Sequence, residues 1–206
     1  SALLPIADPI APIASPTGVS VSAYLPPSTA TNADTKEDHN YVVTAIAANL
    51  VDESSQSSTA SVSNNIFVTG AKNTITWNAV SGASRYRVYK DQGGIFGFIG
   101  ETASTTIIDN NIGPDFSTTP PIYENDFVGT GNYPGAVSYF EQRRVFAGPN
   151  NSPQSIWMTK SGTESNMSFG LPIRDDDRIE FRVAAREANT IRHIVPLTQL
   201  LLLTGS

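Results

Sequence analysis

The segment KNTITWNAVSGASRYRVYKD, residues 72–91, decides the fold class. In its first half Ile75 and Trp77 alternate with polar side chains, and in its second half Tyr86 and Val88 alternate with arginines. A repeat of two places successive side chains on opposite faces, so each half is predicted to be a half-buried strand. The residues SGAS between the halves supply a turn. The segment is therefore predicted to be a strand–turn–strand unit with one apolar face.

Strand patterns also run through the rest of the chain. The segment YVVTAIAANL, from Tyr41, is rich in β-branched and aromatic residues, and shorter segments of the same character follow it: TASVSNNIFVT, FGFIGE, TTIIDN, VSYF, RRVFAG, SIWMTKSG, IEFRVAA, IRHIVPL and QLLLLTGS. With 15 glycines and 14 prolines, long helices are not expected. We predict an all-β protein.

Composition divides the chain into four parts. Residues 1–40 are rich in proline and polar side chains and are predicted to form an extended lead-in and a loop. Residues 41–112 carry the first set of strands, and residues 113–134 lack a periodic pattern, which predicts a linker. Residues 135–206 carry four or five more strands, whose spacing is typical of a propeller blade or an antiparallel sheet.

Several functional classes are excluded or disfavoured by composition. The 206 residues include no cysteine, so disulfides, thiolate zinc sites and a cysteine nucleophile are excluded. The net charge is −6, and tight, charge-driven DNA binding is therefore not expected. The longest apolar run, Leu200 to Leu203, is far shorter than the ~20 residues that a membrane-spanning helix needs. No motif indicates a cofactor.

Two segments resemble hairpins of fibronectin type III or immunoglobulin-like domains. Residues 75–91 resemble the B–C hairpin, with Trp77 in the place of the buried strand-B tryptophan and Tyr86 in the place of the strand-C core aromatic. Residues 41–62 resemble the later F–G hairpin, with Tyr41 at the tyrosine-corner position. The F–G-like hairpin comes first here, so the chain holds either two partial sandwiches or one sandwich in permuted strand order. We favour one sandwich, because half-sandwiches would expose a core face.

A second resemblance covers residues 41–206 and is most specific in the last part of the chain. This part looks like the tail tubular protein B family, the nozzle or tail hub proteins of short-tailed bacteriophages. The points of match are the run Gln142-Arg143-Arg144 before VFAG, Pro153, Trp157, Ser161-Gly162, the turn Asp175-Asp176-Asp177, and the close IRHIVPL…LLLLT. The full expectation is an immunoglobulin/fibronectin-like β-sandwich followed by antiparallel strands of a partial β-propeller-like body.

This second resemblance implies a virion structural protein rather than an enzyme. Family members form a ring, usually sixfold, below the portal and adaptor, and DNA leaves through its lumen. The expected partners are neighbouring copies in a hexameric ring, the portal and adaptor, and tail fibre proteins, with DNA passing through without specific binding. The chain is much shorter than a whole nozzle, so we expect it to be a fragment that covers an inserted sandwich and the first strands of the propeller body.

The turn Asp175, Asp176, Asp177 is the best candidate for a metal site, although a weak one. Hard carboxylate oxygens in a turn could hold Ca²⁺. The turn lacks the glycine and distal glutamate of an EF-hand loop, and arginines flank it. We favour a structural interpretation, in which these carboxylates accept hydrogen bonds from backbone N–H groups and pair with nearby arginines.

The remaining site candidates are interface or structural residues. Arg143 and Arg144, after Gln142, could contact DNA phosphates, but we favour salt bridges between strands or subunits. Trp77 and Trp157 could be sugar platforms, and core packing is favoured for both.

Two other functional classes compete with the virion interpretation. One is a carbohydrate- or protein-binding module of a secreted or surface protein, which would show solvent-exposed aromatic residues in a groove. The other is an enzyme, ranked last. His39 and His193 are the only histidines, no GxSxG motif occurs, and carboxylates such as Asp109, Asp115 and Glu124 cannot be told from surface charges.

Overall fold

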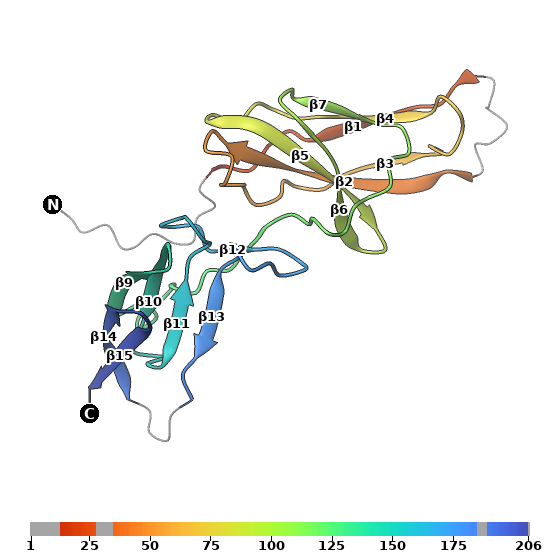
Figure 1. The fold of residues 1–206 in the computed structure, drawn as a ribbon. Coiled ribbons are helices and arrows are strands. Elements are labelled where there is room, and N and C mark those ends of the chain that lie inside the picture. Colours follow the sequence, from red (N-terminus) through yellow and green to blue (C-terminus); the bar gives the residue numbers. More distant parts are fainter. Residues whose placement is uncertain (1–12, 28–34, 185–188, 206) are drawn as a thin grey trace. The chain divides into compact units, whose positions relative to one another are not determined.

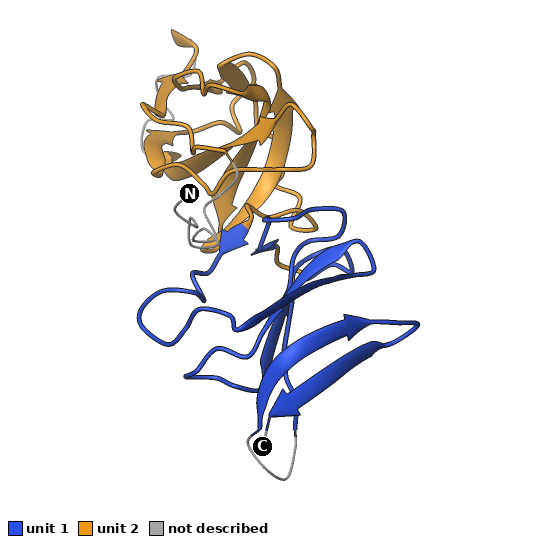
Figure 2. Ribbon diagram, turned by 90° about the vertical axis from the view of Figure 1, so that its left-hand side faces the viewer, with its two compact units in different colours: residues 1–10, 122–169, 173–206 blue, residues 11–121, 170–172 orange. Residues whose placement is uncertain are grey.

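The computed structural model describes residues 13–27, 35–184 and 189–205, and confirms the all-β prediction (Figure 1). The chain divides into two compact units (Figure 2). Among the described residues, the sandwich unit contains 13–27, 35–121 and 170–172, and the second unit contains 122–169, 173–184 and 189–205. No described helix is long and apolar enough to cross a membrane.

The sandwich unit consists of two antiparallel sheets. The three-stranded sheet has the order β1-β4-β7, formed by Ser20–Tyr24, Lys72–Thr76 and Thr106–Asp109. The four-stranded sheet has the order β3-β2-β5-β6, formed by Ala60–Asn64, Glu37–Ala47, Ala83–Gln92 and Ile95–Thr102. Inward-facing side chains of both sheets form one core, as in other aligned sandwiches.

The quoted segment 72–91 contributes the centre of this core. Ile75 and Val88 are completely buried, and Trp77 and Tyr86 meet edge to face with ring centroids 5.4 Å apart. The alternation predicted for this segment is confirmed, because these apolar positions face inward and the arginines of β5 do not.

The strands of the two hairpin-like segments belong to one sandwich. β2 pairs with both β3 and β5 in the four-stranded sheet, whereas β4 lies in the opposite sheet. Strands C, F and G of an immunoglobulin-type sandwich share one sheet in the same way, with B in the other. Among the described residues, this arrangement agrees with one sandwich in permuted strand order and not with two partial sandwiches.

Two features of the sandwich differ from expectation. β1 and the start of β2 lie within residues 1–40, where a lead-in and loop are predicted, and Ile13 is buried in the core. β1 is short, polar and mostly exposed, so its sequence gives little strand signal, and its pairing with β4 fixes it. The hydroxyl of Tyr41 donates to the Asp109 carboxylate rather than to backbone, so this residue does not form a tyrosine corner.

The second unit is built on a four-stranded antiparallel sheet of order β13-β11-β10-β9, formed by Ile179–Arg182, Ser155–Met158, Arg143–Ala147 and Ala136–Phe140. A hairpin of β14 (Thr190–Pro196) and β15 (Leu200–Gly205) and a short pair of β8 (Ile122–Tyr123) and β12 (Ser168–Phe169) accompany it. The described residues form no closed barrel and no propeller. The sheet has the four antiparallel strands of a single blade, but they are not consecutive, because β12 lies between β11 and β13 in the chain and pairs with β8.

Both faces of this sheet are covered by apolar side chains. One face forms a cluster with Ile191 and Ile194 of β14, and the other forms a cluster in which Phe127 packs edge to face on Phe146 and Trp157. Phe127 is 2% exposed, and β8 precedes it, so the segment 113–134 is not the featureless linker that its sequence predicts. Because the segment has no periodic pattern, its sequence does not show that one aromatic residue, Phe127, anchors it to the sheet.

Candidate functional site

The densest group of charges in the second unit surrounds Arg178, the residue before β13. Its side chain is 6% exposed. Nη1 donates to Asp126 at 2.5 Å, and Nη2 donates to Glu180 at 3.1 Å and also to Glu124. The guanidinium also lies over the ring of Phe169, 4.9 Å from its centroid. Arg178 thus joins the segment after β8 to the edge of the main sheet.

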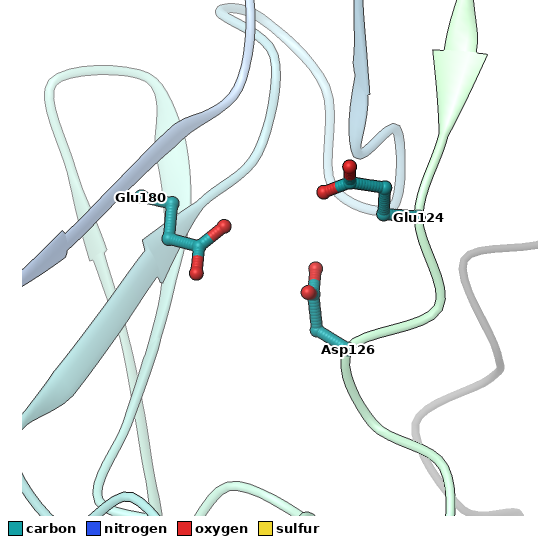
Figure 3. Close-up of side chains that lie close together, drawn as sticks. All are labelled: Glu124, Asp126 and Glu180. Atoms are coloured by element: carbon teal, nitrogen blue, oxygen red, sulfur yellow. The ribbon is translucent and has the colours of Figure 1, made fainter.

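The three carboxylates around Arg178 point toward one another (Figure 3). Their oxygens lie within 4.8 Å of each other, and one guanidinium leaves them two negative charges in excess. Burial, together with the negative charge of Asp126, raises the pKa of Glu180 above its ordinary value. The indole N–H of Trp157 opposes this rise, although it forms no hydrogen bond of ordinary geometry.

Oxygen ligands of this kind could hold a hard cation such as Ca²⁺. Arg178, however, already donates to all three carboxylates and supplies the positive charge that a metal would supply. An open depression of about 510 Å³ lies beside the cluster and is lined in part by Phe169, Ile173 and Arg178. As it stands, the arrangement is an ion-pair anchor with residual negative charge.

The carboxylates of the turn Asp175, Asp176, Asp177 do not belong to this carboxylate group. The carboxylate of Asp177 is buried, accepts from the backbone N–H of Arg174 at 2.9 Å and lies 3.4 Å from Lys160 Nζ. Asp176 pairs with Lys160 at 3.2 Å. Asp177 therefore makes the backbone contact of the structural interpretation, whereas Asp176 and Asp177 pair with a lysine, Lys160, where arginines are expected; the three side chains do not come together as one ligand set.

Arg143, by contrast, is buried and binds backbone oxygens. Its Nη1 donates to the carbonyls of Thr159 and Asp177 at 2.8 and 2.6 Å, and its Nη2 donates to the carbonyl of Asp175 at 2.6 Å. Salt bridging was the expected role for this residue, and the described structure gives it carbonyl partners instead. The guanidinium can do this because its N–H groups form a rigid planar fork.

The neighbours of Arg143 have simpler roles. Gln142 occupies the β9–β10 turn with φ of 62°, and its carbonyl accepts from Gly162 N–H at 2.9 Å. Arg144 pairs with Glu164 at 2.6 Å and stacks on Tyr139, 5.3 Å from the ring centroid. This salt bridge joins β10 to the loop between β11 and β12, and does not join two strands as predicted.

The aromatic candidates lie in the cores. Trp77 and Tyr86 belong to the sandwich core, and Trp157 belongs to the cluster around Phe127. Neither tryptophan presents a face to solvent, since Trp77 is 5% and Trp157 is 6% exposed. Both indole N–H groups are buried without a hydrogen bond.

The sandwich core contains a buried polar network centred on Asp109. Its carboxylate accepts from Tyr41 Oη at 2.7 Å and from the backbone N–H of Ile112 at 2.7 Å, and it lies 2.9 Å from Lys90 Nζ. Asn73 donates to Tyr41 Oη at 2.8 Å. Burial raises the pKa of Tyr41, and the hydrogen bond to Asp109 adds to this rise.

A shallow depression of about 360 Å³ lies on the sandwich unit. Exposed Phe67 and Ile108 line it, together with the side chains of Lys72, Asn110 and Asn111. An exposed aromatic beside amide groups is a combination that can stack on and hydrogen-bond a sugar. No motif in the sequence distinguishes these residues from other surface positions.

The sequence could not have identified the Arg178 group. Asp126 and Glu180 are separated by more than 50 residues, and no motif links the two positions. The strand RIEFR, residues 178–182, offered the only signal, because its charged side chains alternate with apolar ones.

No protein-family model matches the chain, and no curated protein matches it.

Proposed function

We propose that this chain is a non-enzymatic structural component of a bacteriophage tail, part of the nozzle or hub ring through which DNA is ejected. The proposal rests on the resemblance over residues 41–206. The observation that carries it is Arg143, in the middle of the run Gln142-Arg143-Arg144 that the resemblance emphasises. Its buried guanidinium ties three backbone carbonyls together, so the run braces a sheet.

A conduit for DNA needs a stiff wall with little affinity for phosphate. Sheets with apolar packing on both faces supply stiffness. The charge of −6 repels DNA, and two arginines of the second unit are paired with carboxylates: Arg144 with Glu164, and Arg178 with Glu124, Asp126 and Glu180. DNA would therefore pass without specific binding.

The proposed location of this chain is the virion, where neighbouring copies would form a ring. The protein composition of purified particles tests this location most simply. Mass spectrometry of purified particles should find this chain at a fixed ratio to the portal protein, with adaptor and tail fibre proteins in the same tail fraction. Its absence from purified particles would refute the proposal. In filter binding at physiological salt, the purified chain should not retain duplex DNA, and tight retention would contradict the conduit mechanism.

The depression beside Phe67 favours one alternative, a carbohydrate-binding sandwich module. Phe67 is 65% exposed and lines the depression, so that its ring is available for a sugar to stack on. On a glycan array, this alternative predicts binding that Phe67→Ala abolishes and that Phe116→Ala, a change at another exposed aromatic, leaves intact. An array without hits removes it.

A further inference from the structure

β13 is an edge strand that exposes its backbone and its side chains. β13 ends the strand order of its sheet, and among the described strands it pairs with β11 alone (Figure 1). All four of its residues are exposed, with Ile179 at 39% and Phe181 at 41%. An open edge with apolar side chains is a template for another strand.

The backbone hydrogen bonds at the two ends of β13 show which of its N–H and C=O groups face away from β11. The N–H of Val183 donates to Gln154 at the β11 side, whereas the N–H of Arg178 donates to Ser168 on the other side. Successive residues of a strand direct their backbone groups to opposite sides. The N–H and C=O groups of Glu180 and Arg182 therefore face outward.

We propose that β13 pairs antiparallel with β13 of a second copy of this chain, across a two-fold axis at Phe181. In this register the outward-facing groups of Glu180 meet those of Arg182 of the second copy, and the reverse, which gives two hydrogen-bonded, oppositely charged pairs. Phe181 meets its own copy, and Ile179 meets Val183. The strand is thus complementary to itself in charge and in apolar character.

The charge pattern selects this register over its neighbours. A shift by two residues in one direction places Glu180 opposite Glu180, and a shift in the other direction places Arg182 opposite Arg182. Like charges directly opposite one another destabilise a sheet. A shift by one residue fails because it sets outward backbone groups against inward ones.

The surroundings of β13 favour the same partner. The carboxylates of Glu124, Asp126 and Glu180 carry two negative charges more than Arg178 neutralises, and Arg182 of the second copy would arrive beside them. On the opposite face, Val183 already packs against the core cluster that contains Ile156, so an apolar contact there extends an existing core.

This dimer goes beyond the proposed function and is tested separately from it. A two-fold contact joins two chains and does not close a sixfold ring. The dimer is measured on the purified chain, whereas the nozzle proposal is measured on the particle, so the failure of one is distinguishable from the failure of the other. A ladder of about five residues is small, so the dimer is weak and depends on concentration.

Cysteine cross-linking tests the register directly, because the chain has no cysteine of its own. Phe181 and its copy form a non-hydrogen-bonded pair with Cα atoms ~4.5 Å apart, which a disulfide can bridge. Phe181→Cys should therefore give a covalent dimer under mild oxidation. The matched control Ile179→Cys, equally exposed, lies roughly 13 Å from its copy and should stay at background. Equal cross-linking of the two variants would overturn the register.

Exchanging the charges of Glu180 and Arg182 tests whether the partner is a second copy of this chain. For the unmodified chain in sedimentation velocity, the weight-average mass should rise with concentration from 22.0 kDa toward twice that value. Arg182→Glu and Glu180→Lys should each weaken the dimer ~10-fold or more, because like charges then face each other. An equimolar mixture of the two variants restores both opposite-charge pairs and should dimerise again. The proposal fails if the unmodified chain stays monomeric up to ~1 mM, or if the mixture associates no better than its components. Circular dichroism checks that each variant is folded.

Discussion

Removing the carboxylate of Asp109 should unfold the sandwich unit more easily than any surface change. Asp109 is completely buried, and the side chain of its ion-pair partner Lys90 is 9% exposed. In Asp109→Ala, the Lys90 ammonium keeps only a 3.3 Å contact to the Ile112 carbonyl, and the Tyr41 hydroxyl loses the oxygen to which it donates. Breaking a buried pair in this way costs ~3–5 kcal/mol, because a charge stays buried without its counter-ion.

Urea denaturation measures this cost. With a slope of ~2 kcal/mol/M, the loss corresponds to a midpoint lowered by roughly 2 M. Fluorescence in a Trp157→Phe background reports on the sandwich through Trp77, the remaining tryptophan. The matched control is Arg85→Ala, which breaks a pair whose arginine is 54% exposed and should cost at most ~1 kcal/mol.

A second variant separates the buried charge from general damage to the core. Replacing both partners, in Asp109→Leu with Lys90→Met, removes the unpaired charge and should recover part of the stability lost in Asp109→Ala. If Asp109→Ala lowers stability no more than Arg85→Ala does, the network is not a structural element and the reasoning is refuted.

Three further predictions concern the other described contacts. Gly148→Ala should destabilise the second unit by at least ~3 kcal/mol, because the φ of Gly148 is 69° and a Cβ there would collide with a backbone carbonyl of β14. The control Gly162→Ala has a similar φ of 73° but open space around it, and should cost ~1 kcal/mol. Equal thermal shifts of the two variants would contradict this prediction. Arg143→Met should cost ~3–5 kcal/mol in urea denaturation because three backbone carbonyls lose their donor, and a neutral result would remove the bracing role. A hydrogen bond from Arg85 and another from Arg87 hold the pKa of Glu101 below its usual value, so the carboxylate stabilises the fold above pH 4.5, and this contribution is lost as the pH falls through the lowered folded pKa. Glu101→Gln should flatten that loss in an acid titration of stability, and an unchanged slope would count against these pairs.

Much of the sandwich could be predicted from local pattern. The alternation around Trp77 and Tyr86 identified a core face, because side-chain burial in a strand follows a period of two that a sequence shows directly. The reversed order of the two hairpins was also visible, since each hairpin carries its own signature. β1 was missed because a short polar strand is held by its partner and not by its own composition.

Contacts made by long side chains could not be predicted in the same way. Arg143 was expected to pair with a carboxylate, yet it binds carbonyls of a turn more than 30 residues away. Arg178 gathers carboxylates from two separate segments, and no spacing rule links them. Such contacts depend on tertiary packing, which single-sequence pattern does not encode.

The most direct test of the central claim is a cryo-electron microscopy map of the tail of the particle that contains this chain. The proposed function predicts that the β-sandwich and the four-stranded sheet fit density in a ring below the portal and adaptor, with the sheet in the wall around the DNA channel. A tail map whose nozzle density is fully accounted for by other chains would contradict it.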